Sequence, residues 1–337
     1  MSAPVVGPRR SVVAPQGARL ELAGLSGAEA WRTVAETAEL ARASGFDTLW
    51  LEDRTDTVPR REPQPVIEGW TALAALAATV PDIGLGLLSA LPPHRNAVVV
   101  AKQAACADLV SGGRLTLGLP TADHLSEHLA AGGAPLGAET AAALGETVEA
   151  LRALWTGTRT TLDGEVVTLA GAHAVPTPLG PRLPLSVRAD AARTDAAALL
   201  PEAVVRECSA VQWEGEPDEV ARAIRDFGRR REALGLDPAG VRHALFAECR
   251  VFDDRLGRDR WLATPHVVVF WSHHPDLLAR RSLYGTVHQL VEKAGEYTAG
   301  GVEEFVLWFR DYPSTESLRR FAEEIAPRVP TAVTAGV

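Results

Sequence analysis

Residues 96–119 read NAVVVAKQAACADLVSGGRLTLGL, and this stretch decides the fold. Between residues 98 and 110 the apolar side chains recur at mixed spacings of three and four, which predicts a buried helix. Gly112 and Gly113 then supply the left-handed backbone conformation that ends a helix at little energetic cost. The chain passes at once into residues 114–119, Arg-Leu-Thr-Leu-Gly-Leu, which predict a short buried strand. A helix, a stop and a strand in this order make half of a β/α repeat.

Strand and helix patterns alternate along the rest of the chain. Ser26 and Glu29 have the spacing of a capping box, which marks the start of a helix that runs towards residue 44. Asp163-Gly164 closes a predicted hairpin over residues 160–169. The other expected strands cover residues 19–23, 46–51, 83–89, 183–187, 244–252 and 305–309. The other expected helices cover residues 65–79, 139–155, 218–234, 286–299 and 313–325.

Alternating strands and helices require a parallel sheet with helices packed outside it. An open doubly wound sheet would need a G-x-G-x-x-G phosphate turn after an early strand, whereas the chain there reads Gly24-Leu-Ser-Gly27. We therefore predict an α/β fold of the (β/α)8 TIM barrel type. Residues 1–18 are expected to be a flexible lead-in, 19–330 a single barrel domain and 331–337 a tail. The stretch 253–281, rich in Trp and His, predicts an irregular insertion before the last repeats.

The composition excludes several classes of protein. The formal net charge is −9 and the chain has only two lysines, so a nucleic-acid partner is not expected. No apolar run approaches the roughly 20 residues that span a bilayer, so no membrane partner is expected either. Residues 1–17 hold no continuous apolar core, and we expect a cytoplasmic protein without a secretory signal. Cys106, Cys208 and Cys249 are odd in number and far apart, which favours reduced thiols.

Two segments resemble the bacterial-luciferase-like superfamily of flavin- and deazaflavin-dependent oxidoreductases. In the first, a helix that ends in Ser111-Gly-Gly-Arg114 leads into the strand that would be the fourth of the barrel. In the second, residues 300–314 and 318–324 are similar to the end of that barrel. The resemblance implies an enzyme that uses reduced FMN with dioxygen as a monooxygenase on a small organic substrate. The first alternative is an F420-dependent hydride-transfer reductase. The second alternative is a barrel that has lost catalysis and serves as a binding or partner subunit.

The resemblance also places candidate residues at the ends of the second and third strands, where barrel enzymes carry their sites. Relatives often have an Asp-His pair where this chain has Asp53 and Arg54. An arginine stays charged and can only orient or stabilise an anion, so Arg54 is a catalytic candidate of a different kind, or else a solvated loop residue. Leu87, Leu88 and Ser89 occupy the place of a backbone bulge beneath the flavin ring, or an ordinary strand end. We expect Asp53 and these three residues to bind the cofactor.

After the fourth strand, Asp123 aligns with the acid of the deazaflavin branch. Asp123 and His124 are therefore further catalytic candidates, although a helix cap is the alternative for Asp123. His124 also begins an H-x-x-E-H pattern with Glu127 and His128, which is typical of some zinc peptidases. No third ligand is evident downstream, so we predict no metal and expect these histidines at the surface or in a pocket wall. His273-His274 is similarly ambiguous.

After the fifth strand, relatives usually have glycines whose backbone holds the cofactor phosphate, and residues 186–193 lack them. Arg188 and Arg193 are the candidates to bind that phosphate instead, because guanidinium pairs with phosphate in a bidentate manner. Residues 201–207 also lack the sixth-strand pattern of many relatives. The resemblance further implies a homodimer and a separate flavin reductase that supplies the reduced cofactor.

Overall fold

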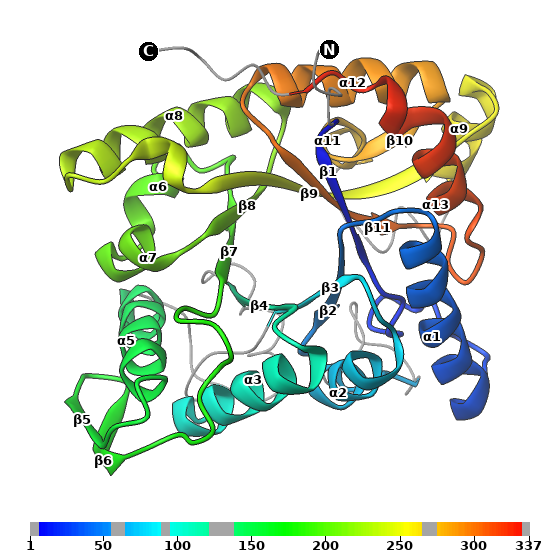
Figure 1. The fold of residues 1–337 in the computed structure, drawn as a ribbon. Coiled ribbons are helices and arrows are strands. Elements are labelled where there is room, and N and C mark those ends of the chain that lie inside the picture. Colours follow the sequence, from blue (N-terminus) through cyan, green and yellow to red (C-terminus); the bar gives the residue numbers. More distant parts are fainter. Residues whose placement is uncertain (1–6, 55–64, 89–94, 121–137, 265–274, 332–337) are drawn as a thin grey trace, which may run out of the picture.

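The computed structural model describes residues 7–54, 65–88, 95–120, 138–264 and 275–331. Its centre is a closed barrel of eight parallel strands, surrounded by helices (Figure 1). A pairing between the sixth and seventh of these strands closes the sheet, so the predicted (β/α)8 barrel is confirmed. The barrel strands in chain order are β1 (Arg9–Val13), β2 (Thr48–Glu52), β3 (Gly84–Leu88), β4 (Leu115–Pro120), β7 (Leu185–Asp190), β8 (Ala210–Glu214), β9 (Arg242–Val251) and β11 (Glu304–Phe309).

Helices of unequal length cover the outside of the barrel. The described α-helices are α1 (Gly27–Ala43), α2 (Gly69–Thr79), α3 (Ala97–Ser111), α5 (Ala138–Leu154), α6 (Ala196–Leu199), α7 (Glu202–Glu207), α8 (Pro217–Ala233), α9 (Arg255–Leu262), α11 (Pro275–Arg281), α12 (Val287–Ala299) and α13 (Glu316–Arg320). A π-helical segment, Phe321–Ile325, continues α13, and short 3-10 turns cover Pro238–Gly240 and Ala326–Arg328. Among the helices that the structure describes, none is both long and apolar enough to span a membrane.

The segment that decides the fold has the predicted form. Asn96 caps α3 by accepting hydrogen bonds from the backbone N–H groups of Val98 and Val99. Gly112 ends the helix with φ 71°, and the next residues form β4 between β3 and β7. The capping box of Ser26 and Glu29 on α1 is also confirmed.

The expected first strand over residues 19–23 is wrong. Residues 17–24 form bends and turns in which Gly17 and Leu20 have φ values of 93° and 66°, which an extended strand does not allow. The first strand is β1, which lies within the stretch expected to be a lead-in and pairs with β2 and β11. Three apolar or small residues, Ser11, Val12 and Val13, are buried there by partners that are distant in sequence.

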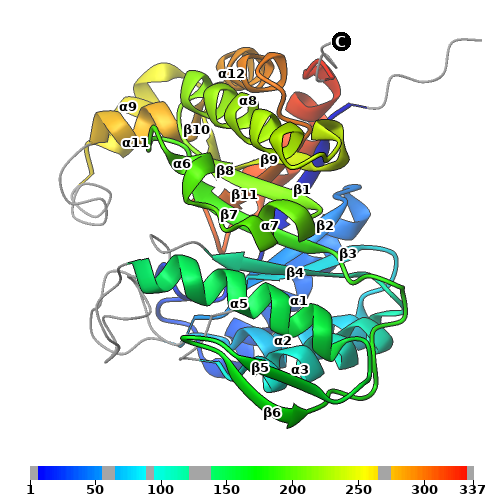
Figure 2. The ribbon, with the colours of Figure 1, turned by 90° about the vertical axis from the view of Figure 1, so that its left-hand side faces the viewer.

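Residues 201–207 are not a degenerate sixth strand. Pro201 precedes the helix α7 there, and the sixth barrel strand is β8, Ala-Val-Gln-Trp-Glu. Its polar residue Gln212 faces the inside of the barrel, which hides the strand from a search for apolar runs. The hairpin is present as β5 (Thr160–Asp163) and β6 (Thr168–Ala172), outside the barrel beside α5 (Figure 2).

The stretch 253–281 contains α9 and α11, which lie at the carboxyl end of the barrel (Figure 2). A short extra strand, β10 (Leu283–Gly285), follows them and pairs in parallel with the last residues of β9. β8 pairs with the first residues of β9 and β10 pairs with its last residues, so β10 continues the sheet beside β9 where β8 has ended.

A tryptophan fills the middle of the barrel. The ring of Trp50 lies against Gly86 and Gly118, where an added Cβ would come within 2.3 Å and 2.9 Å of ring atoms. These two glycines are therefore needed for close approach of the ring rather than for a turn.

Candidate active site

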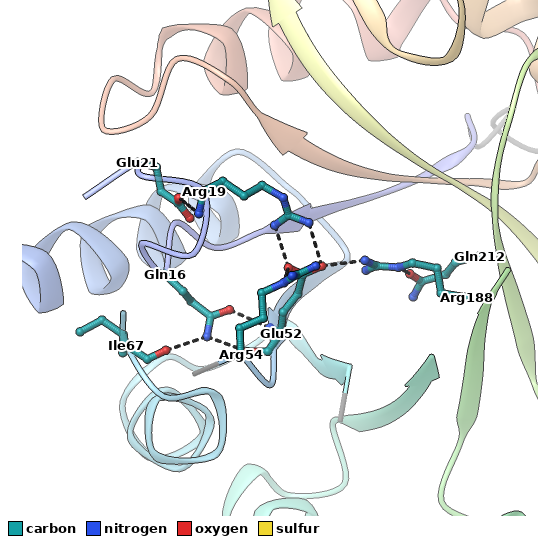
Figure 3. A network of polar contacts seen from close by, with 8 residues as sticks. All are labelled: Gln16, Arg19, Glu21, Glu52, Arg54, Ile67, Arg188 and Gln212. Atoms are coloured by element: carbon teal, nitrogen blue, oxygen red, sulfur yellow. Dashed lines mark hydrogen bonds and ion pairs between the residues drawn. The ribbon is translucent and has the colours of Figure 1, made fainter. Parts of the chain in front are cut away.

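A buried carboxylate at the end of β2 gathers three guanidinium groups (Figure 3). Oε2 of Glu52 lies 2.7 Å from Nη1 of Arg19 and 2.8 Å from Nε of Arg54, and Oε1 lies 2.6 Å from Nη1 of Arg188. Burial opposes ionisation of this carboxyl group, but the three guanidiniums together hold the pKa of Glu52 well below its ordinary value. We call Arg19, Glu52, Arg54 and Arg188 the Glu52 cluster. It carries three positive charges against one negative charge.

Two glutamines hold the Glu52 cluster in place (Figure 3). The side chain of Gln16 accepts a hydrogen bond from the backbone N–H of Glu52 at 2.7 Å and donates to its carbonyl at 3.0 Å. Gln212 on β8 accepts from Nε of Arg188 at 3.3 Å and donates to Ser186. Both ends of the ion pair that crosses the barrel are therefore fixed by neutral amides.

Arg188 is almost completely enclosed. Its guanidinium lies 3.6 Å from the ring centroid of Phe246, and 1% of its side chain is exposed. Within the described part of the chain, its Nη2 has no hydrogen-bond partner. A buried donor without an acceptor costs free energy, so this group favours a ligand oxygen that would accept from it.

Guanidinium groups and aromatic rings alternate at the carboxyl end of the barrel. Arg19 and Arg310 lie 4.5 Å and 4.8 Å from the ring of Trp308. Arg310 and Arg250 lie 6.0 Å and 4.9 Å from the ring of Trp261, which α9 contributes. We call these five residues the guanidinium–aromatic stack. Cation–π contacts of this kind each contribute about 0.5–2 kcal/mol.

A second carboxyl group lies beside the stack. The hydroxyl of Tyr284, on β10, donates a hydrogen bond to Oε2 of Glu248, on β9. Nε of Arg310 is 3.6 Å from the same oxygen. Burial raises the pKa of Glu248 above its ordinary value, although Arg310 and Tyr284 act in the opposite direction. The barrel thus holds one carboxyl group whose pKa is lowered and one whose pKa is raised.

The predicted residue Asp53 is buried but points away from the Glu52 cluster. Its carboxylate accepts two hydrogen bonds from Arg95, at 2.6 Å and 2.9 Å, and one from Nε1 of Trp70 at 3.3 Å. Arg95 also binds Glu68, the cap of α2. In this structure Asp53 therefore ties β2 to α2 and to the start of α3.

The predicted residues on β3 lie on opposite faces of that strand. Leu88 shares the inward face with Gly86, because side chains of a strand alternate. Leu87 faces outward, next to Gly69 on α2. Both are buried. Only Leu88 is placed to line the interior.

The two predicted phosphate ligands lie apart from one another. Arg188 is inside the barrel, whereas Arg193 is exposed and pairs with Asp195 at 3.2 Å. Arg54 is brought to the Glu52 cluster and is buried, so the solvated alternative does not describe it.

Several predicted positions lie outside the described residues. They are Ser89, Asp123, His124, Glu127, His128 and the pair 273–274. Within the described ranges, no three His, Cys, Asp or Glu side chains come together as a metal site would require.

Sequence reasoning did not single out Glu52, Arg19, Glu248 or Arg310. A signal existed for Glu52, since it is a charged residue that ends the buried strand β2, at the end of the barrel where sites form. Arg19 was assigned to the wrongly placed first strand, and Glu248 is an acid inside an otherwise apolar strand.

The opposite end of the barrel has a polar cavity of about 210 Å³. Its lining includes Arg9, Arg242 and Glu304. Glu304 accepts from Oγ of Ser11 at 2.5 Å and from Arg242 at 2.9 Å. Because the carboxylate satisfies these donors internally, this end has the character of a structural ion-pair cluster.

The match to a family model shows the family to which the chain belongs. The model for luciferase-like monooxygenases matches residues 11–260, so the chain belongs to that family. The predicted superfamily is thereby confirmed.

Individual relatives are similar over part of their length. An uncharacterized protein of Mycobacterium tuberculosis is 31% identical over 175 residues, which cover 47% of this chain and 60% of that protein. The F420-dependent glucose-6-phosphate dehydrogenase of Nocardia farcinica is 32% identical over 167 residues, 48% of this chain and 49% of that enzyme. This chain thus spans between about half and three fifths of these two curated relatives.

A solved structure agrees with the fold over nearly the whole chain. An F420-dependent secondary alcohol dehydrogenase in complex with an F420-acetone adduct superposes with a TM-score of 0.79 and 16% identity. The alignment covers 96% of this chain and 99% of that one. At this identity the likeness supports the barrel architecture.

Proposed function

We propose that the protein is an oxidoreductase that holds a reduced flavin at the carboxyl end of the barrel and uses it with dioxygen as a monooxygenase. The substrate is a small organic molecule. The observation that carries the proposal is the Glu52 cluster, in which three buried guanidiniums share one carboxylate.

The residues present fit a reduced flavin. Its pyrimidine ring has carbonyl oxygens that accept hydrogen bonds and carries negative charge in the reduced form. The Glu52 cluster offers excess positive charge, and Arg188 offers a buried N–H without an acceptor among the described residues. Charge placed near this ring is one of the ways in which a protein tunes the cofactor. When bound, the cofactor would supply the electrons of the reaction.

Each part of the site has a separate task. Arg188 and Arg54 would orient the ring and stabilise its charge, while Glu52 fixes both arginines. Asp53 would support the site from behind by anchoring α2 through Trp70 and Arg95. The stacked rings of the guanidinium–aromatic stack would exclude water, which strengthens every ionic contact in the site.

F420-dependent hydride transfer is the second candidate, because the Nocardia farcinica relative is named for that cofactor. Oxidation of an alcohol requires a base that takes the hydroxyl proton, and an arginine does not serve as one near neutral pH. Arg54 therefore favours the direction in which the reduced deazaflavin donates hydride to a substrate.

A titration of the purified protein with FMN and with F420, each oxidised and reduced and followed by fluorescence, separates these candidates. We expect tight binding of one cofactor, which selects the branch. Arg188→Met should weaken that binding at least tenfold, whereas Arg206→Gln, which alters only an exposed pair with Glu202 on α7, should leave it unchanged. If neither cofactor binds, the barrel is a binding or partner subunit and the enzymatic proposal is wrong.

The wider setting also belongs to the proposal. We infer a homodimer in the cytoplasm that receives reduced cofactor from a separate flavin reductase, as the family resemblance implies. Sedimentation of the purified protein at several concentrations tests the dimer, and copurification or complementation with a flavin reductase tests the second partner.

A further inference from the structure

We propose that Glu248 is the residue that holds and donates a proton at the carboxyl end of this barrel, with Tyr284 and Arg310 positioned to stabilise the carboxylate that remains. This inference rests on the proposed function. It adds a proton donor to a site whose other described charges serve to bind and orient.

The strand β9 directs Glu248 inward. Phe246, two residues earlier, stacks on Arg188 inside the barrel, and alternate residues of a strand share a face. Glu248 is also in register with Trp308, on which Arg19 of the Glu52 cluster stacks. The carboxyl group therefore lies inside the barrel, on the side where Arg188 and Arg54 are proposed to hold the flavin ring, rather than on the outer surface.

Glu248 and Glu52 differ in how closely cations approach them. Glu52 has three guanidiniums at 2.6–2.8 Å, and they stabilise its ionised form. Glu248 instead pairs with Nε of Arg310 at 3.6 Å, and it accepts a hydrogen bond from the neutral hydroxyl of Tyr284. Such a carboxyl group can exchange a proton without breaking an ion pair at hydrogen-bond distance.

The surroundings of Glu248 bias it towards the protonated form. Four charged or polar groups on neighbouring elements influence its pKa: Tyr284 on β10, Arg310 after β11, Arg19 after β1 and Glu214 on β8. Burial raises the pKa of Glu248, Glu214 raises it further, and the two arginines and Tyr284 lower it. The pKa of Tyr284 is itself raised well above its ordinary value by burial, so this phenol stays a hydrogen-bond donor.

The proposed step is a simple proton transfer. The O–H bond of the Glu248 carboxyl group breaks, its electron pair stays on the carboxylate, and the proton goes to a basic oxygen or nitrogen of the substrate. Tyr284 and Arg310 then stabilise the carboxylate, and solvent returns the proton. Arg54 cannot perform this step, and Asp53 is occupied by Arg95 and Trp70.

Glu304 provides a matched control. It is also a buried, inward carboxylate with a hydroxyl and a guanidinium as partners, but it lies at the opposite end of the barrel. Glu304→Gln therefore makes the same chemical change to a buried carboxylate at a place that the proposal does not involve.

The first test is infrared difference spectroscopy of the full-length protein during pH titration. We expect a band of a protonated, buried carboxyl group that persists above the usual pH range of glutamate. It should vanish in Glu248→Gln, persist in Glu304→Gln and titrate at higher pH in Tyr284→Phe, because that variant loses a donor to the carboxylate. A band that is absent in the wild type or unchanged in Glu248→Gln overturns the proposal.

The second test uses bound cofactor and needs no substrate. The midpoint potential of bound FMN, or of F420 if that cofactor is the one that binds, is measured against pH. We expect a change of slope where Glu248 titrates, lost in Glu248→Gln and retained in Glu304→Gln. If the change of slope of midpoint potential against pH survives in Glu248→Gln, Glu248 is not the group that titrates next to the cofactor ring, and the proposal is wrong. If neither cofactor binds, the proposed function and the donor role both fail, whereas the infrared band reports on the proton of Glu248 alone.

Discussion

Nη1 of Arg188 lies 2.6 Å from Oε1 of Glu52, and this ion pair joins β7 to β2 through the inside of the barrel. Two other strands, β3 and β4, stand between them in the sheet. The pair therefore crosses the interior rather than following the sheet, and it sets the character of the site. A buried ion pair adds little net stability, yet removing one partner leaves the other charge uncompensated.

Glu52→Gln should be strongly destabilising, since it leaves three buried guanidiniums without their carboxylate. We expect a loss of about 3–5 kcal/mol in the free energy of unfolding, measured by urea denaturation. Glu202→Gln, which breaks the exposed pair with Arg206 on α7, should cost less than about 0.5 kcal/mol. Equal effects of the two changes would contradict the arrangement in the Glu52 cluster.

The same residue should make stability depend on acidity. Burial disfavours its charge but the guanidiniums prevail, so the pKa of folded Glu52 lies well below the ordinary 4.5. Its contribution is fully present above that ordinary value and is lost as the pH falls through the lowered folded pKa. Urea midpoints measured across this acid range should fall in the wild type and change less in Glu52→Gln. Parallel curves would be inconsistent with a carboxylate held by three cations.

A buried histidine should act in a less acidic window. Burial and the nearby Arg231 lower the pKa of His243 from 6.5 to about 4, while Nε1 of Trp213 donates to its Nδ1 at 3.1 Å. Because the neutral form is the folded one, stability should be full above 6.5 and decline as the pH falls from 6.5 to about 4, by at most about 3 kcal/mol. His243→Gln should remove this slope, whereas His288→Gln, on the exposed face of α12, should keep it.

Gly86→Ala should disturb the middle of the barrel. The added Cβ would lie 2.3 Å from the Trp50 ring, and overpacking of this kind costs about 1–3 kcal/mol or more. Trp50→Phe in the same molecule should recover part of the loss, because the smaller ring yields space. Gly180→Ala is the control, since nothing lies within 4 Å of its added Cβ. Thermal unfolding is compared among the wild type, Gly86→Ala, Trp50→Phe, the double variant and Gly180→Ala, and additive losses in the double variant would refute the contact.

The barrel could be predicted from local patterns, whereas much of the site could not. The helix, stop and strand at 96–119 follow from apolar spacing and the two glycines, and the structure contains all three. The first strand was missed because β1 is only five residues long and is stabilised by β2 and β11, which are distant in sequence. A search for local patterns cannot detect partners of that kind.

The Glu52 cluster illustrates the same difficulty for the site. Arg19 is 33 residues from Glu52 along the chain, and Arg188 is 136 residues from it. The three side chains come together because the strands close into a barrel. The sequence did indicate Arg54 and Arg188 as unusual residues at strand ends. It did not indicate that they bind the same carboxylate, because the direction of each side chain depends on the register of the strands.

The midpoint potential of the bound cofactor, compared with that of the free cofactor, tests the central claim most directly. If the excess of guanidinium charge around Glu52 stabilises a reduced, negatively charged ring, the protein binds the reduced form more tightly and the potential rises on binding. Arg188→Met should reverse at least part of that rise, and Arg206→Gln, which alters only an exposed pair on α7, should not. A potential that stays unchanged or falls on binding, or a protein that binds neither FMN nor F420, would contradict the account.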